Sequence, residues 1–183
     1  MREQCSCRSL LGWTWRLLFL WAMTIAPSAF AQFSSYLGVT LSELQAALEK
    51  GGGPLAFAPR PGSAQNTQEA RLLENAGVVQ AGGSAGNLSV VVLWLPTDGK
   101  GKFASVKTRL YLDAFAQLFT DDSAPLVRWV EQVLERAVTE GGDTPSLESQ
   151  LLDERQFKAM YTPTLSPPML SLTVEASGSG ASR

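Results

Sequence analysis

The sequence predicts an α+β fold, in which an antiparallel sheet of about five or six strands carries helices packed on one face. Three observations support this prediction. Two segments with good capping residues have apolar residues at helical spacing, several shorter segments are rich in β-branched residues, and turn-forming residues separate them. Because an antiparallel sheet can leave its second face to water, we expect that face to be free of helices.

Residues 1–31 have the three features of a cleavable secretory signal peptide. Three arginines precede an apolar stretch at 17–26, and Ala29 and Ala31 provide the small residues that cleavage requires. The apolar stretch is shorter than the ~20 residues of a membrane-spanning helix. We therefore expect cleavage after Ala31, no stable membrane insertion afterwards, and a periplasmic or secreted protein.

The segment after the leader contains neither cysteine nor histidine, since both cysteines precede it and the chain has no histidine. Disulfides, Ser-His-Asp triads, Cys-His pairs and zinc or haem sites built on these residues are thereby excluded. The same segment has 12 Lys and Arg against 16 Asp and Glu and no basic run, so we expect no nucleic-acid partner. Its length predicts a single α+β domain at 32–175, and the Gly/Ser-rich end at 176–183 predicts a disordered tail.

The first expected helix begins at a capping box, Thr40-Leu-Ser-Glu43, and ends at the glycines 51–53. Its apolar residues recur at helical spacing on one face. A short apolar strand is expected at 54–58. The polar, glycine- and proline-bearing segment 60–75 predicts a long loop or a poorly ordered excursion.

Two hairpins are expected next. Strands at 78–81 and 88–95 flank a glycine-rich turn, and the β-branched residues of the second strand indicate a central position. A further turn at 96–101 precedes an alternating stretch at 102–112, which predicts another strand. The residues expected on the core face of that strand are Ala104, Val106, Leu110 and Leu112.

Two helices are expected after that strand. The segment 114–119 fits a short helix on the core side, and a stronger helix runs from about Ala124 to Thr139 behind the acidic cap Asp121-Asp122. We expect the stronger helix to pack against the strand 88–95. Its apolar stripe consists of Leu126, Val130, Val133, Leu134 and Ala137.

The last part of the chain predicts two more strands. An acidic stretch at 143–154 is expected to be a linker. Strands then follow at 157–161 and 169–174, with a proline-bearing connection between them.

Three segments resemble ligand sites but have simpler explanations. The pair Asp121-Asp122 lacks the alternating ligands of a calcium loop, and helix capping explains it. The segment 98–102 lacks the residue order that wraps a phosphate, and a hairpin turn explains it. The glycines at 82–86 precede a strand rather than the helix that a phosphate cradle needs.

Four side chains are candidate catalytic groups. Ser105 and Lys107 share a strand face and could form a serine–lysine pair, although a polar surface does not activate the lysine. Glu131 and Glu135 could form a carboxylate pair, but their spacing is typical of a solvated helix surface.

Two large aromatic residues remain to be placed. Trp94 lies on the most apolar strand and Trp129 lies on the most amphipathic helix. We expect the two to pack together in the core. Exposure of either one would instead mark a ligand or partner site.

Two functional hypotheses of different classes stay open. The first is an exported, non-catalytic binding module whose open sheet face binds a protein, an envelope component or a small ligand. The second is a histidine-free, carboxylate-based hydrolase acting outside the cytoplasm. Composition favours the first because it excludes most catalytic designs, and the sequence assigns no catalytic, cofactor-binding or metal-binding residue.

Overall fold

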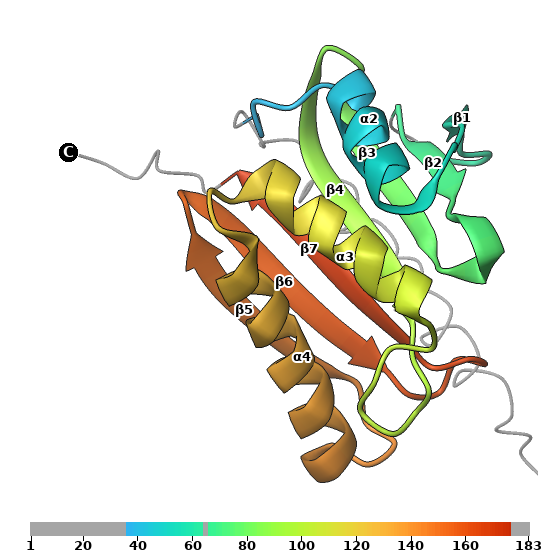
Figure 1. Ribbon diagram of the computed structural model, residues 1–183, viewed down its shortest axis with the longest axis vertical. Helices are drawn as coiled ribbons and strands as arrows, with labels where there is room; N and C mark the ends of the chain where they lie inside the picture. The colour runs from blue at the N-terminus through green and yellow to red at the C-terminus, as the bar shows by residue number, and fades with distance from the viewer. Residues whose placement is uncertain (1–35, 64–65, 177–183) are drawn as a thin grey trace, which may run out of the picture. The chain divides into compact units, whose positions relative to one another are not determined.

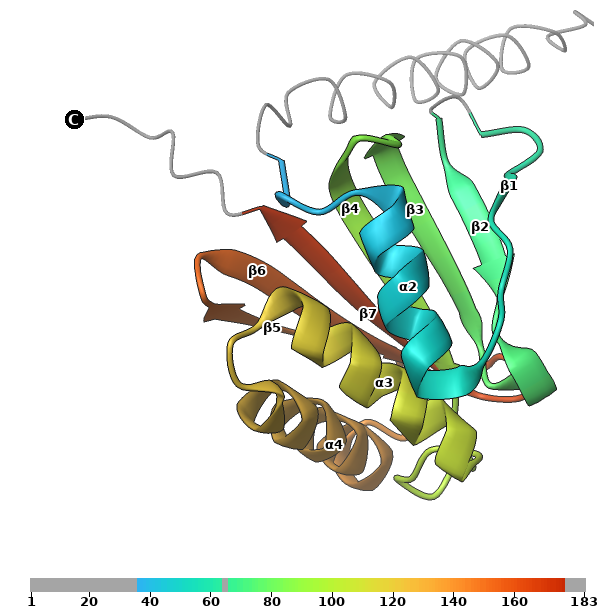
Figure 2. The same ribbon diagram turned by 45° about the horizontal axis from the view of Figure 1, so that its top comes forward.

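In the computed structural model, which describes residues 36–63 and 66–176, a seven-stranded antiparallel sheet carries three α-helices (Figure 1). The strand order is β1-β2-β3-β4-β7-β6-β5, and the helices lie over the same face of the sheet (Figure 2). The α+β prediction is confirmed, with slightly more strands than expected. The elements in chain order are α2 (Leu41–Gly52), β1 (Ala58–Pro59), β2 (Gln68–Arg71), the 3-10 turn η1 (Leu73–Asn75), β3 (Val78–Ser84), β4 (Asn87–Pro96), α3 (Val106–Phe119), α4 (Ser123–Glu140), β5 (Ser146–Leu152), β6 (Arg155–Thr162) and β7 (Met169–Ala176).

Several predicted features can be placed against these elements. The hairpin of β3 and β4 and the final strands β6 and β7 are confirmed. The short strand expected at 54–58 is the two-residue β1. The predicted signal peptide at 1–31 and the predicted tail beyond Ala176 lie outside the described residues.

Alternation along the strands separates the two faces of the sheet. Leu93 on β4 is paired with Val79 on β3 and with Leu172 on β7, and all three side chains are fully buried on the helix side. Val92 and Trp94, on either side of Leu93, point to the helix-free face and are half-buried. The core therefore lies between the helices and one face of the sheet.

Helix α2 begins as the sequence predicts. The Thr40 hydroxyl accepts the Glu43 N–H at 3.2 Å, and the Glu43 carboxylate accepts the Thr40 N–H at 2.8 Å, which completes the capping box. The helix ends at Gly52, and Gly53 caps it. Gly52 also permits close packing, because a Cβ there would overlap the ring of Tyr111 on α3.

The second predicted hairpin is wrong, because a helix replaces the strand expected at 102–112. Ser105 caps α3 by accepting the Thr108 N–H at 3.1 Å, and the predicted short helix at 114–119 is the second half of α3. Val106 and Leu110, expected in the core, are exposed by 79% and 42%. The alternation of apolar residues was coincidental, since the fully buried side chains follow helical spacing. They are Thr108, Tyr111, Leu112, Phe115, Ala116 and Phe119.

Two segments predicted as connections contain strands. Within 60–75, β2 pairs with β3 and the turn η1 follows it. Within 143–154, β5 pairs with β6 as an edge strand. Both strands lie at or near an edge, where polar, exposed side chains weaken the hydrophobic pattern.

Helix α4 is confirmed, and its predicted apolar stripe is buried. Its predicted partner is wrong, because α4 lies over β5 and β6 while α3 lies over β4 (Figure 2). The reason is that α3 is a long helix rather than a strand. It occupies the middle of the sheet, so α4 covers the strands beside it.

Candidate functional site

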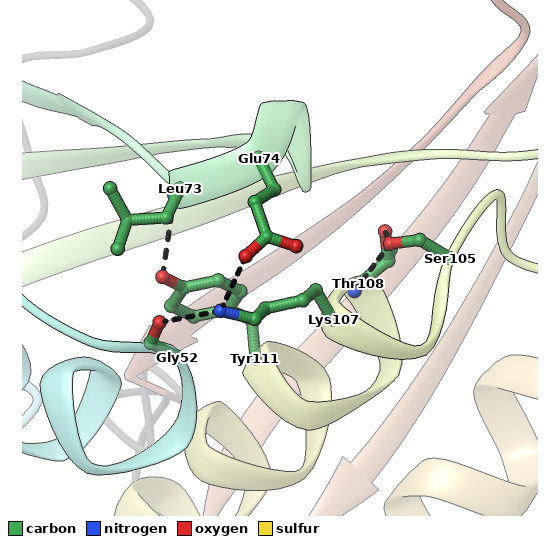
Figure 3. A network of polar contacts seen from close by, with 7 residues as sticks. All are labelled: Gly52, Leu73, Glu74, Ser105, Lys107, Thr108 and Tyr111. Atoms are coloured by element: carbon green, nitrogen blue, oxygen red, sulfur yellow. Dashed lines mark hydrogen bonds and ion pairs between the residues drawn. The ribbon is translucent and has the colours of Figure 1, made fainter.

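Ser105 and Lys107, which a serine–lysine hydrolase needs side by side, make separate contacts at the start of α3 (Figure 3). The Ser105 hydroxyl lies 3.0 Å from the Thr108 hydroxyl and accepts the Thr108 N–H at 3.1 Å. Lys107 Nζ forms an ion pair with Glu74 at 2.9 Å and donates to the Gly52 carbonyl at 3.4 Å. A general base must reach the proton it removes, so this pair is not arranged for catalysis.

The same network joins three parts of the fold. Lys107 connects α3 to the end of α2 and to η1, and the Tyr111 hydroxyl accepts the Leu73 N–H at 3.3 Å (Figure 3). Tyr111 is fully buried, so its hydroxyl requires this partner. The network therefore explains these side chains by packing.

The loop at 98–102 is closed by its own aspartate. The Asp98 carboxylate accepts the N–H groups of Lys100 at 2.7 Å and Lys102 at 3.0 Å. These two backbone hydrogen bonds lower the pKa of Asp98 below its ordinary value. Since backbone N–H groups are what a phosphate cradle would offer, the loop is a turn rather than an anion site.

Glu131 and Glu135 line a cavity of about 500 Å³ between the loop at 97–105 and the helices α3 and α4. Arg109 on α3 also lines it and forms ion pairs with Glu131 and, at 3.4 Å, with Asp113. The side chains of Arg109 and Glu131 are each 40% exposed, so water reaches the pair. A carboxyl group that donates a proton near neutral pH needs shielding from water, and the cavity does not provide it for Glu131.

The acidic pair Asp121-Asp122 begins α4. Asp122 accepts the Ala124 N–H at 3.0 Å as the helix cap, and the Asp121 N–H donates to the Asp153 carboxylate at 3.2 Å. Capping thus accounts for Asp122, as the sequence indicates. Across residues 36–63 and 66–176, no group of three or more acidic, histidine or cysteine side chains is placed to hold a metal.

Trp94 and Trp129, expected to pack together in the core, lie on opposite sides of the sheet. Trp129 is half-buried on α4 and packs against the core. Trp94 is half-buried on the helix-free face, because its neighbours Leu93 and Leu95 are the residues of β4 that face the helices. The prediction of joint packing is wrong.

A row of mainly apolar side chains crosses the helix-free face. Paired residues on neighbouring strands share a face of the sheet. Pairing from β3 to β5 aligns Val78, Trp94, Ser171, Met160 and Leu147, which we call the Trp94 row. Ser171 is only 4% exposed between its two larger neighbours, whereas Leu147 at the edge is 66% exposed.

Polar contacts surround the Trp94 row. The Trp94 indole N–H donates to Gln80 Oε1 at 3.4 Å, and Gln80 Nε2 donates to the Glu69 carboxylate at 2.9 Å. Lys158 and Glu175 form an ion pair at 2.7 Å on the same face. Protein interfaces combine an aromatic anchor with a polar rim, and this face has both.

The fold and this face define an α+β domain with one helix-free, partly apolar sheet surface. Comparison with protein-family models, curated proteins and solved structures finds no match to the chain. None of the helices in the described part of the chain is long and apolar enough to cross a membrane. The function of the protein is therefore inferred from the residues themselves.

Proposed function

We propose that the protein is an exported, non-catalytic interaction module that binds another protein on the helix-free face of its sheet. The observation that carries the proposal is the Trp94 row, which keeps aromatic and aliphatic side chains partly exposed on a broad surface. Tryptophan and methionine are enriched at the centre of protein interfaces. Sites for small molecules are concave pockets, so a broad sheet face is better suited to a protein surface.

Site-specific photo-crosslinking in the cells that make the protein tests the binding face. A crosslinking amino acid at Met160 or Thr173 should give one discrete adduct with a partner protein. Trp94→Ala should abolish that adduct while the variant keeps the parental circular dichroism spectrum. The matched control is the same amino acid at Arg128, which is exposed on α4 and should give no adduct. An adduct at Arg128 that persists in Trp94→Ala would place the partner on the helix side instead.

The export part of the proposal is supported by the leader features of residues 1–31. Mass spectrometry of the protein recovered outside the cytoplasm should find an N-terminus at or within a few residues of Gln32. Recovery of an intact Met1 terminus from the membrane fraction would contradict cleavage.

A carboxylate-based hydrolase is the second candidate, and one observation favours it: Glu131 and Glu135 line the same cavity. In that case one carboxyl group would protonate the leaving group and the other would activate water or attack the substrate. The purified protein should then hydrolyse a glycoside, ester or peptide, and Glu135→Gln should abolish turnover. Absence of turnover on every one of the three substrate classes would exclude this candidate.

A further inference from the structure

Strand β5 ends the sheet on one side and carries exposed leucines. In the described part of the chain it pairs only with β6, so its outer edge has no strand beside it (Figure 1). Leu147 and Leu151 are exposed by 66% and 64%, and their spacing places both on the helix-free face. A seven-residue edge with exposed leucines is a template for pairing with another strand.

The turn after β5 determines which of its backbone groups point outward. Asp153 and Glu154 form a two-residue turn with φ angles of 47° and 61°, and Leu152 pairs with Arg155 across it. In such a hairpin the residues next to the turn exchange hydrogen bonds, and bonded and non-bonded pairs then alternate along the strand. The N–H and C=O groups that point away from β6 are therefore those of Leu147, Ser149 and Leu151.

We propose that two copies of the chain pair antiparallel through β5, about a two-fold axis at Ser149, so that their sheets become one. This axis sets Leu147 opposite Leu151 of the second copy and Ser149 opposite its counterpart, so the outward-pointing backbone groups meet. Glu148 then lies opposite Gln150, which is uncharged. An axis at Glu148 would set two carboxylates against each other, which is unfavourable. The stretch Leu-Glu-Ser-Gln-Leu is thus complementary to itself, as a two-fold interface requires.

One unpaired polar atom on the helix side of β5, Gln150 Oε1, supports a missing neighbour. Three buried side-chain polar atoms of the described residues lack a hydrogen-bond partner, and two of them, Ser146 Oγ and Gln150 Oε1, belong to β5. Buried polar atoms normally have partners. The second copy brings Glu148 and its ion-pair partner Arg136, 2.6 Å apart, to the position opposite Gln150. This inference rests on the strand edge alone and does not depend on the proposed function.

Sedimentation equilibrium of the protein purified from its own cells tests the pairing. The parent should have the mass of two chains at micromolar concentration. Ser149→Pro removes an outward N–H without removing a bond to β6, so it should give the mass of one chain and the parental circular dichroism spectrum. The double variant Leu147→Lys with Leu151→Lys is a second test, and it should also give one chain because charged edges block pairing. A parent of one chain, or a dimer that survives both changes, would overturn the proposal.

A disulfide test locates the two-fold axis. When Cys5→Ser and Cys7→Ser are combined with Ser149→Cys, the chain has one cysteine, which faces its counterpart at a Cα separation of about 5.5 Å, within disulfide range. Oxidation should link two chains. The matched control Ser42→Cys, at an exposed position on α2, should stay unlinked under the same conditions. Equal linking at both positions, or none at Ser149, would contradict the axis.

Discussion

Two leucines in α3 provide a test that separates a helix from a strand. In a strand at 102–112, Leu110 and Leu112 would point to the same face, so truncating either one to alanine would cost a similar amount of unfolding free energy. In the observed helix, Leu112 is fully buried, whereas Leu110 is 42% exposed beside the groove between α2 and α3. We expect Leu112→Ala to destabilise the protein far more than Leu110→Ala.

The magnitudes follow from burial. Truncating a fully buried leucine costs about 2–5 kcal/mol, because apolar burial is lost and a cavity is left. Leu110→Ala removes a side chain that keeps nearly half of its surface in water, and alanine is at least as good a helix former, so we expect about 1 kcal/mol or less. At about 2–4 °C per kcal/mol, Leu112→Ala should lower Tm by roughly 4–20 °C and Leu110→Ala by less than about 4 °C.

Urea and thermal unfolding, followed by far-ultraviolet circular dichroism, measure both variants. The dependence of unfolding free energy on urea should keep the parental slope, so that the difference reports stability. Equal losses for the two variants, or a larger loss for Leu110→Ala, would refute the register of α3.

Two further predictions concern α4 and the cap of α2. Val130→Asp places a carboxylate at a fully buried position and should not yield folded protein. Its control, Glu131→Ala, loses one exposed ion pair and should change the unfolding free energy by at most about 1 kcal/mol. If Val130→Asp melted like the parent, the apolar stripe of α4 would not face the core. The Thr40 N–H, and to a smaller extent the Thr40 hydroxyl, lower the pKa of Glu43 in the folded state. Ionised Glu43 therefore stabilises the folded state at pH values above its ordinary pKa of about 4.3. This stabilisation is lost as the pH falls through the lower pKa of the folded state. The urea midpoint of Glu43→Gln should therefore fall less than that of the parent on acidification, and identical curves would argue against the cap.

Elements with strong local signals were predictable from the sequence. The capping box at Thr40 fixes the start of α2, and the apolar stripe that includes Val130 identifies α4. Strands β2 and β5 were missed because pairing with the next strand in the chain, rather than a pattern of apolar residues, defines them. In β5 only alternate side chains reach the helix side, and several of these are polar, such as Glu148 and Gln150. The local pattern of β5 is therefore weak, although its pairing with β6 is continuous.

A helix-free face was expected, but which residues of β4 lie on it could not be predicted, because both faces of β4 are apolar. Leu93 and Leu95 face the helices, while Val92 and Trp94 face the opposite side, and no difference in residue type separates the two sets. Which set is covered depends on where α3 packs, and that is decided by contacts between distant segments. A helix can cover only one face of the strand, so the apolar side chains on the other face keep surface in contact with water. Trp94, half-buried and hydrogen-bonded to Gln80, lies outside the core of the described residues, which supports the proposed binding face.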